Sequence, residues 1–210
     1  MADTNTIKDN SVTKGISVRK TALIGMFGAI AAVLMFIEMP IPVIAPPFYK
    51  IDFSEVPVLI GTFAMGPVAG ILIELIKILL HLLVKGTSTA GVGELGNFIV
   101  GLALVLPAGL IYRVHKTRRT AVVGMVVGTL TMVLAGSLIN AFVLLPMYAT
   151  AFGGMEAIIA AGTAVHSSVD SVFGFVALCV APFNLIKGVI TSILTMLLYK
   201  RISGLIKREH

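Results

Sequence analysis

The feature that most limits the fold is a set of apolar runs, each about as long as a lipid bilayer is thick. The last, Pro182 to Tyr199, reads PFNLIKGVITSILTMLLY. A lysine inside a membrane helix costs about 2.5 to 3.5 kcal/mol on insertion scales, so its side chain is expected to face the protein interior or a water-filled cavity. Asn184 and Lys187 are three residues apart and share one helix face. We therefore expect this face to form the floor of a binding site.

The composition explains why the apolar runs are interpreted as membrane spans. Of the 210 residues, 57% are hydrophobic and 12% are charged, which leaves too little polar surface to cover a soluble core. The formal net charge is +6, but the basic residues form short clusters between apolar runs, as in the cytoplasmic loops of membrane proteins. The chain is therefore predicted to be an all-α integral membrane protein in contact with lipid, and nucleic acid is not an expected partner. The single Cys179 excludes an intrachain disulfide.

Six transmembrane helices are expected in one membrane domain, residues 21–205, between cytoplasmic tails at 1–20 and 206–210. The expected helices are Thr21 to Met39, Phe53 to Met65, Pro67 to Val84, Glu94 to about Tyr112, Ala121 to about Leu145, and Pro182 to Tyr199. The second is about 20 Å long, too short to cross a bilayer core of roughly 30 Å alone. Pro146 to Ala181 is too polar in its middle for another span, and its apolar end, Val172 to Val180, is too short.

A proline-rich segment, Met39 to Lys50, joins the first two helices. It has four prolines in twelve residues, which forbid a helix and favour extended or turn backbone. Such backbone is tolerated at membrane depth only where protein buries it or where it lines a cavity. The loop should therefore dip into the membrane above the short second helix.

The basic residues set the orientation. With six helices and both ends cytoplasmic, twelve of the sixteen Lys and Arg residues lie in cytoplasmic segments, as the positive-inside rule requires. The other four are Lys50, Lys77, Lys85 and Lys187. In this topology four tyrosines are expected to form aromatic belts at the two membrane interfaces. They are Tyr49 and Tyr148 on the outer side, and Tyr112 and Tyr199 on the inner side.

The same topology brings several polar residues from separate parts of the chain toward the outer half. They are Lys50, Asp52, Glu94, Asn97, Asn140, Asn184 and Lys187. For Asp52 a structural role is a strong alternative, because a carboxylate just before a helix caps free N–H groups. An amide inside a span must find partners, so Asn140 and Asn184 favour a ligand with a hydrogen-bonding edge. We expect an outward-facing binding site here.

A second polar set, Glu74, Lys77 and His81, lies on one face of the third helix with spacing i, i+3, i+7. The first two residues form either an internal ion pair or, with His81, a proton relay or ligand contact. The relay interpretation gives the alternative function, a stand-alone ion-coupled carrier. GVGELG, from Gly91, matches GxGxxG, but no strand precedes it, so a dinucleotide site is not expected. No paired histidine ligands or nucleophile and base are visible, so we expect neither an enzyme nor a metal site.

Three motifs resemble a known family over essentially the whole chain. KIDFSEVPVLIGTFAMGPVAGILIELIK begins at Lys50, NAFVLLPMY at Asn140 and APFNLIKG at Ala181. Together and in this order they are similar to the riboflavin-binding S components of energy-coupling factor (ECF) vitamin transporters. The resemblance implies six helices around an outward-facing vitamin pocket in the bacterial cell membrane. It also implies a separate transmembrane T component and two ATP-binding subunits, and this chain has no GxxxxGK[ST] phosphate loop of its own.

The resemblance further implies which residues contact the vitamin. Asn140, Asn184 and Lys187 would contact the flavin, together with Asn97 and Glu94, while the loop from Pro46 to Lys50 would close over it. Phe48 and Val43 would offer apolar walls to the tricyclic ring, and Lys50 belongs to the same lid. Riboflavin is then a transported substrate rather than a cofactor, and its phosphate, FMN, stays open as a ligand.

The first span is the expected contact face for the T component. Members of this family carry an Ala-x-x-x-Ala pattern there, whereas this chain has Gly25-x-x-x-Ala29 and Gly28-x-x-x-Ala32. Small residues at this spacing permit close helix approach in lipid. The alternative is internal helix packing.

Overall fold

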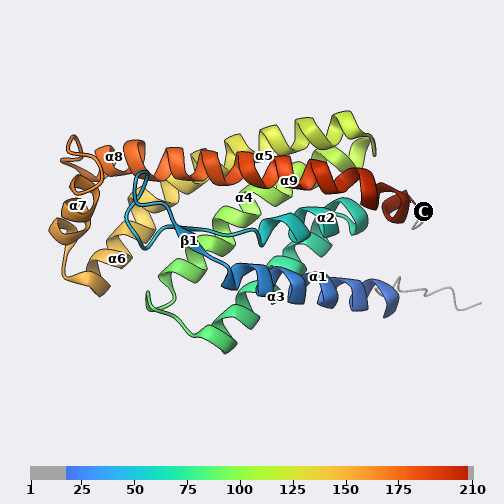
Figure 1. Ribbon diagram of the computed structural model, residues 1–210, viewed down its shortest axis with the longest axis horizontal. Helices are drawn as coiled ribbons and strands as arrows, with labels where there is room; N and C mark the ends of the chain where they lie inside the picture. The colour runs from blue at the N-terminus through green and yellow to red at the C-terminus, as the bar shows by residue number, and fades with distance from the viewer. Residues whose placement is uncertain (1–17, 208–210) are drawn as a thin grey trace, which may run out of the picture.

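A computed structural model describes residues 18–207 (Figure 1). Most of the expected N-terminal tail, and the last three residues of the C-terminal tail, lie outside this range. The elements in chain order are α1 (Val18–Phe36), β1 (Met39–Pro40), β2 (Lys50–Ile51), α2 (Glu55–Met65), α3 (Pro67–Lys85), α4 (Val92–Val114), α5 (Arg118–Ile139), η1 (Asn140–Leu144), α6 (Leu145–Phe152), α7 (Met155–Thr163), α8 (Val172–Phe175), η2 (Val176–Val180) and α9 (Ala181–Lys207).

The described residues form an all-helical membrane protein, apart from the two-residue strands β1 and β2. Five helical segments are long and apolar enough to cross a membrane: Val18–Phe36, Pro67–Lys85, Val92–Val114, Arg118–Ala151 and Val172–Tyr199. The short helix α2 has 11 residues, which agrees with the expected short second helix.

The last span begins earlier than the sequence analysis predicted. A continuous helical segment runs from Val172 through Pro182, so the expectation that Val172 to Val180 is separate from the last span was wrong. The cause is the π-helical turn η2, after which the N–H of Ala181 bonds to the carbonyl of Val176. Pro182 follows directly, at the second residue of α9, where the changed bonding pattern accommodates a residue that has no N–H to donate.

Close packing of α4 against α5 forms one side of the bundle. A Cβ built on Gly128 would lie 2.3 Å from the carbonyl oxygen of Leu104, and one on Gly124 would lie 2.8 Å from that of Ala108. Only glycine permits this approach of two backbones, as is common for helices packed in lipid. The two glycines thus fix the position of α4, which carries Glu94 and Asn97.

The proline-rich loop is extended and turn-like, as predicted. β1 pairs antiparallel with β2, with Met39 opposite Ile51 and Pro40 opposite Lys50. The ring of His166 lies 3.3 Å from the carbonyl oxygen of Ile44, which ties the middle of the loop to the segment that follows α7. The loop is thereby held beside the helices rather than extending away from them (Figure 1).

The four tyrosines do not form aromatic belts, so that prediction was wrong. The hydroxyls of Tyr112 and Tyr199 lie 2.8 Å apart, and both side chains are buried. Tyr148 is only 5% exposed, and Tyr49 lies against the rings of Phe48 and Phe183. Three of the tyrosines are therefore buried inside the protein, and Tyr49 is half-buried among neighbouring rings.

The two small-residue pairs of α1 have different surroundings. A Cβ on Gly28 would lie 2.5 Å from Cγ2 of Ile76, and Ala32 is 3% exposed, so this pair packs against α3 within the chain. Gly28 and Ala32 are therefore corrected from a partner contact to internal packing. Gly25 has nothing within 4 Å of an added Cβ and Ala29 is exposed, so this second pair lies on an open face.

Candidate binding site

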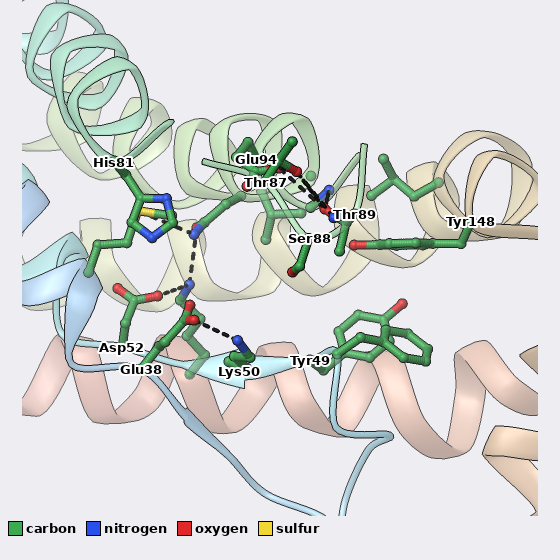
Figure 2. A pocket seen from close by; sticks show the side chains of 18 of the residues that line it. Glu38, Tyr49, Lys50, Asp52, His81, Thr87, Ser88, Thr89, Glu94 and Tyr148 are labelled. Atoms are coloured by element: carbon green, nitrogen blue, oxygen red, sulfur yellow. Dashed lines mark hydrogen bonds and ion pairs between the residues drawn. The ribbon is translucent and has the colours of Figure 1, made fainter. Parts of the chain in front are cut away.

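A cavity of about 300 Å³ lies where the proline-rich loop meets α3, α4, η1 and α9 (Figure 2). This volume is at the lower end of the range for small-molecule sites. The structure brings together the residues that the sequence analysis proposed as ligand contacts, with the exception of Val43. The cavity is lined by Phe48, Lys50, Glu94, Asn97, Asn140, Asn184 and Lys187, among others.

Aromatic rings form one end of the cavity. The ring centroid of Phe48 lies 4.9 Å from that of Tyr49 and 5.3 Å from that of Tyr148, and Tyr49 lies 5.4 Å from Phe183. Val43, expected as a further wall, is 79% exposed and does not line the cavity. The rings come from the loop, α6 and α9, so a flat apolar ligand would contact three separate elements at this end.

Asn140 is held in one orientation by two hydrogen bonds. Its Oδ1 accepts from the hydroxyl of Tyr49 at 2.5 Å, and its Nδ2 donates to the carbonyl of Gly136 at 2.7 Å. It begins the π-helical segment η1, and π turns occur frequently at functional sites. The loop is thus bonded through Tyr49 to the helix that lies beneath it.

Asn184 differs because its amide nitrogen is not satisfied. Its Nδ2 is buried and has no hydrogen-bond partner among the described residues, although the side chain is only 4% exposed and lines the cavity. Buried polar groups in folded proteins are almost always paired. An unpaired donor on a cavity wall indicates where an acceptor atom of a ligand would bind.

Lys187 is the buried cation at the floor of the cavity. Its Nζ lies 3.1 Å from Oδ2 of Asp52 and 3.2 Å from Oδ1 of Asn97. The other oxygen of Asp52 accepts hydrogen bonds from the N–H and hydroxyl of Ser54, so this carboxylate both anchors the start of α2 and pairs with the lysine. Burial raises the pKa of Asp52, but the charges of Lys187 and Lys77 and the bonds from Ser54 outweigh it and lower that pKa to about 2.

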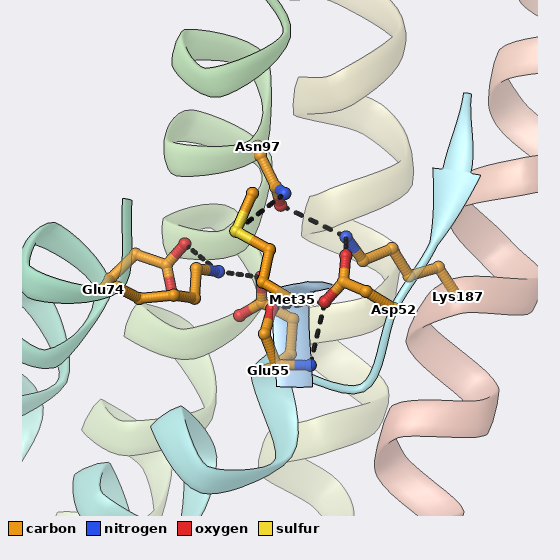
Figure 3. A network of polar contacts seen from close by, with 8 residues as sticks. Met35, Asp52, Glu55, Glu74, Asn97 and Lys187 are labelled. Carbon is orange, nitrogen blue, oxygen red and sulfur yellow. Dashed lines mark hydrogen bonds and ion pairs between the residues drawn. The ribbon is translucent and has the colours of Figure 1, made fainter. Parts of the chain in front are cut away.

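A second charged group lies near the first (Figure 3). Lys77 Nζ is 2.8 Å from Oε1 of Glu55 and 2.6 Å from Oε1 of Glu74, and all three side chains are fully buried. The structure thus contains the internal ion pair that was one of the two interpretations of Glu74 and Lys77. Glu55, which the sequence analysis did not identify, completes a group of two carboxylates around one ammonium. Gly101 provides space for both, because a Cβ there would lie within 2.8 Å of each carboxylate.

His81 takes no part in this charged group. Its ring stacks on Phe36 with centroids 5.3 Å apart, and its two nitrogens are buried without a partner among the described residues. It lines the cavity beside Lys85. The proposed relay of Glu74, Lys77 and His81 is therefore not a hydrogen-bonded chain in this structure.

Ion pairs that the sequence analysis did not predict lie at the rim of the cavity. Glu38 lies 2.6 Å from Lys50 and 2.5 Å from Lys85, so it joins the loop to the end of α3. Partial burial raises the pKa of Glu38, but hydrogen bonds from the two lysines and their charges have the larger combined effect and lower it. Glu38 was visible in the sequence as the single acidic residue of the first apolar run.

Glu94, on the first turn of α4, is held by the linker that precedes it. Its Oε2 accepts hydrogen bonds from Thr87 at 2.9 Å and from Thr89 at 3.3 Å. The linker thus places a carboxylate and several hydroxyls along one side of the cavity (Figure 2). The cavity therefore has an aromatic end and a longer polar side.

A bundle of apolar spans around a buried aromatic and polar cavity defines a membrane protein with a small-molecule site. The family model for the substrate-specific component of ECF transporters matches residues 19–199. A riboflavin transporter RibU of Staphylococcus aureus is 38% identical over 190 residues, 90% of this chain and 93% of that protein. Riboflavin transporter FmnP of Bacillus subtilis is 33% identical over 92% of this chain and 97% of its own length. A solved structure of the S component of a bacterial ECF transporter shares 36% identity at a TM-score of 0.70, covering 90% of this chain and 98% of the other.

This chain belongs to the family of ECF transporter substrate-specific components. It is accordingly a multi-pass protein of the bacterial cell membrane and a component of a transport system rather than an enzyme.

Proposed function

We propose that this protein captures riboflavin from outside the cell and delivers it to an ATP-driven ECF complex. The observation that carries the proposal is the cavity floor, where the unpaired amide nitrogen of Asn184 lies on the same helix as Lys187. The pyrimidine edge of a flavin alternates acceptors with one donor, and amide and ammonium groups complement such an edge. Relatives at 38% and 33% identity are riboflavin transporters by name.

The rest of the cavity suits the other parts of the vitamin. Phe48, Tyr49, Tyr148 and Phe183 offer aromatic faces to a flat tricyclic ring. The hydroxyls of the linker before α4 and the carboxylate of Glu94 offer partners to a polyhydroxyl chain such as ribityl. A ligand that is apolar at one end and polar at the other matches this division.

The loop from Pro46 to Lys50 acts as the lid in this proposal. Lys50 reaches Glu38, and Tyr49 reaches Asn140, so the lid is attached through two polar contacts that a ligand can exchange for its own. Proline limits the freedom of the loop, so it is expected to move as a unit when it opens.

The proposed topology has six transmembrane helices, counting the short α2, and both termini in the cytoplasm. In support, the start of α1 and the end of α9 lie at the same end of the bundle, together with the basic hairpin between α4 and α5 (Figure 1). Basic loops mark the cytoplasmic side. The binding cavity lies toward the other end, which would face outward.

The partners in this proposal are a transmembrane T component and two ATP-binding subunits. The pair Gly25 and Ala29 on the open face of α1 is the proposed contact with the T component, because small residues on such a surface allow a partner helix to approach closely.

The test is a titration of purified protein with riboflavin, followed by quenching of flavin fluorescence. Asn184→Ala and Lys187→Ala should each weaken binding by about 1 to 3 kcal/mol, the usual cost of leaving a buried polar group unpaired. Leu185→Ala is the matched control, because Leu185 lies on the same helix turn, is 45% exposed and does not line the cavity. Absence of riboflavin binding by the unmodified protein would overturn the proposal, and unchanged affinity of both site variants would remove these residues from the site.

A further inference from the structure

A second cavity, of about 260 Å³, lies away from the proposed riboflavin site. It is lined by the N-terminal end of α1, the turn between α2 and α3, and the C-terminal end of α4. These parts of the bundle meet at the end where α9 also finishes (Figure 1). Three basic residues from three places line it: Lys20 on α1, Arg113 on the last turn of α4, and Lys116 in the following hairpin.

No acidic residue among residues 18–207 balances these three charges. Glu38, Asp52 and Glu94 line the riboflavin cavity, and Glu55 and Glu74 surround Lys77. Two others, Glu156 on α7 and Asp170 just before α8, lie at the opposite end of the bundle (Figure 1). None of the ion pairs formed within the described range includes Lys20, Arg113 or Lys116. The cavity thus has a positive field that an anion would neutralise.

The surroundings of the cavity distinguish a lipid from a free anion. Val68, which lines it, is 65% exposed, and Leu110 and Val114 on the neighbouring turns of α4 are 55% and 73% exposed. Apolar side chains of membrane spans that point outward in this way contact acyl chains. A cationic pocket beside such a surface offers places for both parts of one molecule, a negatively charged headgroup and its tails.

We propose that this second cavity binds the phosphodiester headgroup of an anionic membrane phospholipid. Lys20, Arg113 and Lys116 contact the phosphate, and the lipid tails run along the exposed faces of α3 and α4. Because Lys20 belongs to α1 and the other two to the end of α4, the lipid joins these two helices at the end of the bundle away from the riboflavin site. The site does not depend on which vitamin the protein carries.

The experiment measures lipid binding by the whole chain, purified in a neutral detergent. Thermal melting is followed by circular dichroism with added phosphatidylglycerol, phosphatidylcholine or inorganic phosphate, and native mass spectrometry counts the bound lipid. Phosphatidylglycerol should raise the melting temperature and remain bound, whereas phosphatidylcholine should not. Inorganic phosphate acting as strongly as phosphatidylglycerol would identify a free-anion site and overturn the lipid proposal.

Two double variants that remove the same charge distinguish a specific lipid site from general attraction by the positive charge of the hairpin. Arg113→Gln with Lys116→Gln removes two cavity residues and should weaken phosphatidylglycerol binding about 25-fold, about fivefold for each charge. Arg118→Gln with Arg119→Gln removes the same charge from the same hairpin but from residues that do not line the cavity, and should change binding little. Equal losses in the two variants would overturn the proposal.

Two controls complete the test. Riboflavin binding should be normal in both double variants, which shows that they are folded and keeps this inference separate from the proposed function. If the cavity variant binds lipid normally but loses the T component during purification, the cavity is a protein contact instead and the lipid proposal is wrong.

Discussion

Replacement of Lys77 by methionine tests whether the buried charged group stabilises the fold. Methionine is unbranched and of similar length, so it fills the space without the charge. The change leaves Glu55 and Glu74 facing each other without a cation, although both are fully buried. Removal of one partner from a buried ion pair costs about 3 to 5 kcal/mol, because the remaining charge is uncompensated. We therefore expect Lys77→Met to destabilise the protein by about this amount.

The assay is thermal unfolding in detergent, followed by circular dichroism. For a domain of this size about 1 kcal/mol corresponds to 2 to 4 °C, so Lys77→Met should lower the melting temperature by roughly 6 to 20 °C. Glu74→Gln is the contrasting variant: it should cost much less, because Glu55 remains to pair with the lysine. Combining Lys77→Met with glutamine at both acidic positions should recover part of the loss. If Lys77→Met melts within about 2 °C of the unmodified protein, the charged group does not stabilise the fold as argued.

The remaining predictions concern pH, the partner face and the lid. The lowered pKa of Asp52 stabilises the folded protein, and this contribution is complete above the unfolded pKa of about 4 and is lost as the pH falls through about 2. Asp52→Asn should remove about 2 kcal/mol of this pH-dependent stability. A variant whose melting temperature depends on pH as in the unmodified protein would contradict the prediction. Ala32→Leu should lower the melting temperature, because Ala32 is buried and no space is left around it for a larger side chain. Ala29→Leu, at an exposed position, should leave the melting temperature unchanged and reduce co-purification of the T component. Full retention of the T component would exclude this face as the contact. A thiol at Phe48→Cys, with Cys179 replaced, should be labelled more slowly when riboflavin is bound, and equal labelling rates would mean that the lid does not close.

The polar residues in apolar runs were the part of the cavity that the sequence could predict. An asparagine or lysine in a membrane span has few places to lie, so Asn140, Asn184 and Lys187 could be assigned to an internal site without any structure. The helix order, including the short α2, followed from run lengths in the same way. All three residues line the cavity in the structure.

The location of a residue that suits two different environments could not be predicted from the sequence. Tyr49 and Tyr148 have an apolar ring and a polar hydroxyl, which suit a membrane interface and a cavity wall equally well. Glu55 was missed because it meets Lys77 across 22 positions of sequence, whereas Glu74 is visible as a neighbour on the same helix. Pro182 was interpreted as a helix start, since the π turn that accommodates it is not apparent from composition.

The π turn at η1 sets which side of the following helix faces the cavity. Such a turn contains one residue more than an α turn, so it accommodates one residue with little added rotation. If the same residues formed an unbroken α-helix, everything beyond η1 would be rotated by about 100° relative to Asn140. Tyr148, which shares the cavity with Asn140, would then leave it while keeping its identity and its helix. The direction in which this helix presents its side chains therefore helps to define the site, in addition to the chemistry of the side chains themselves.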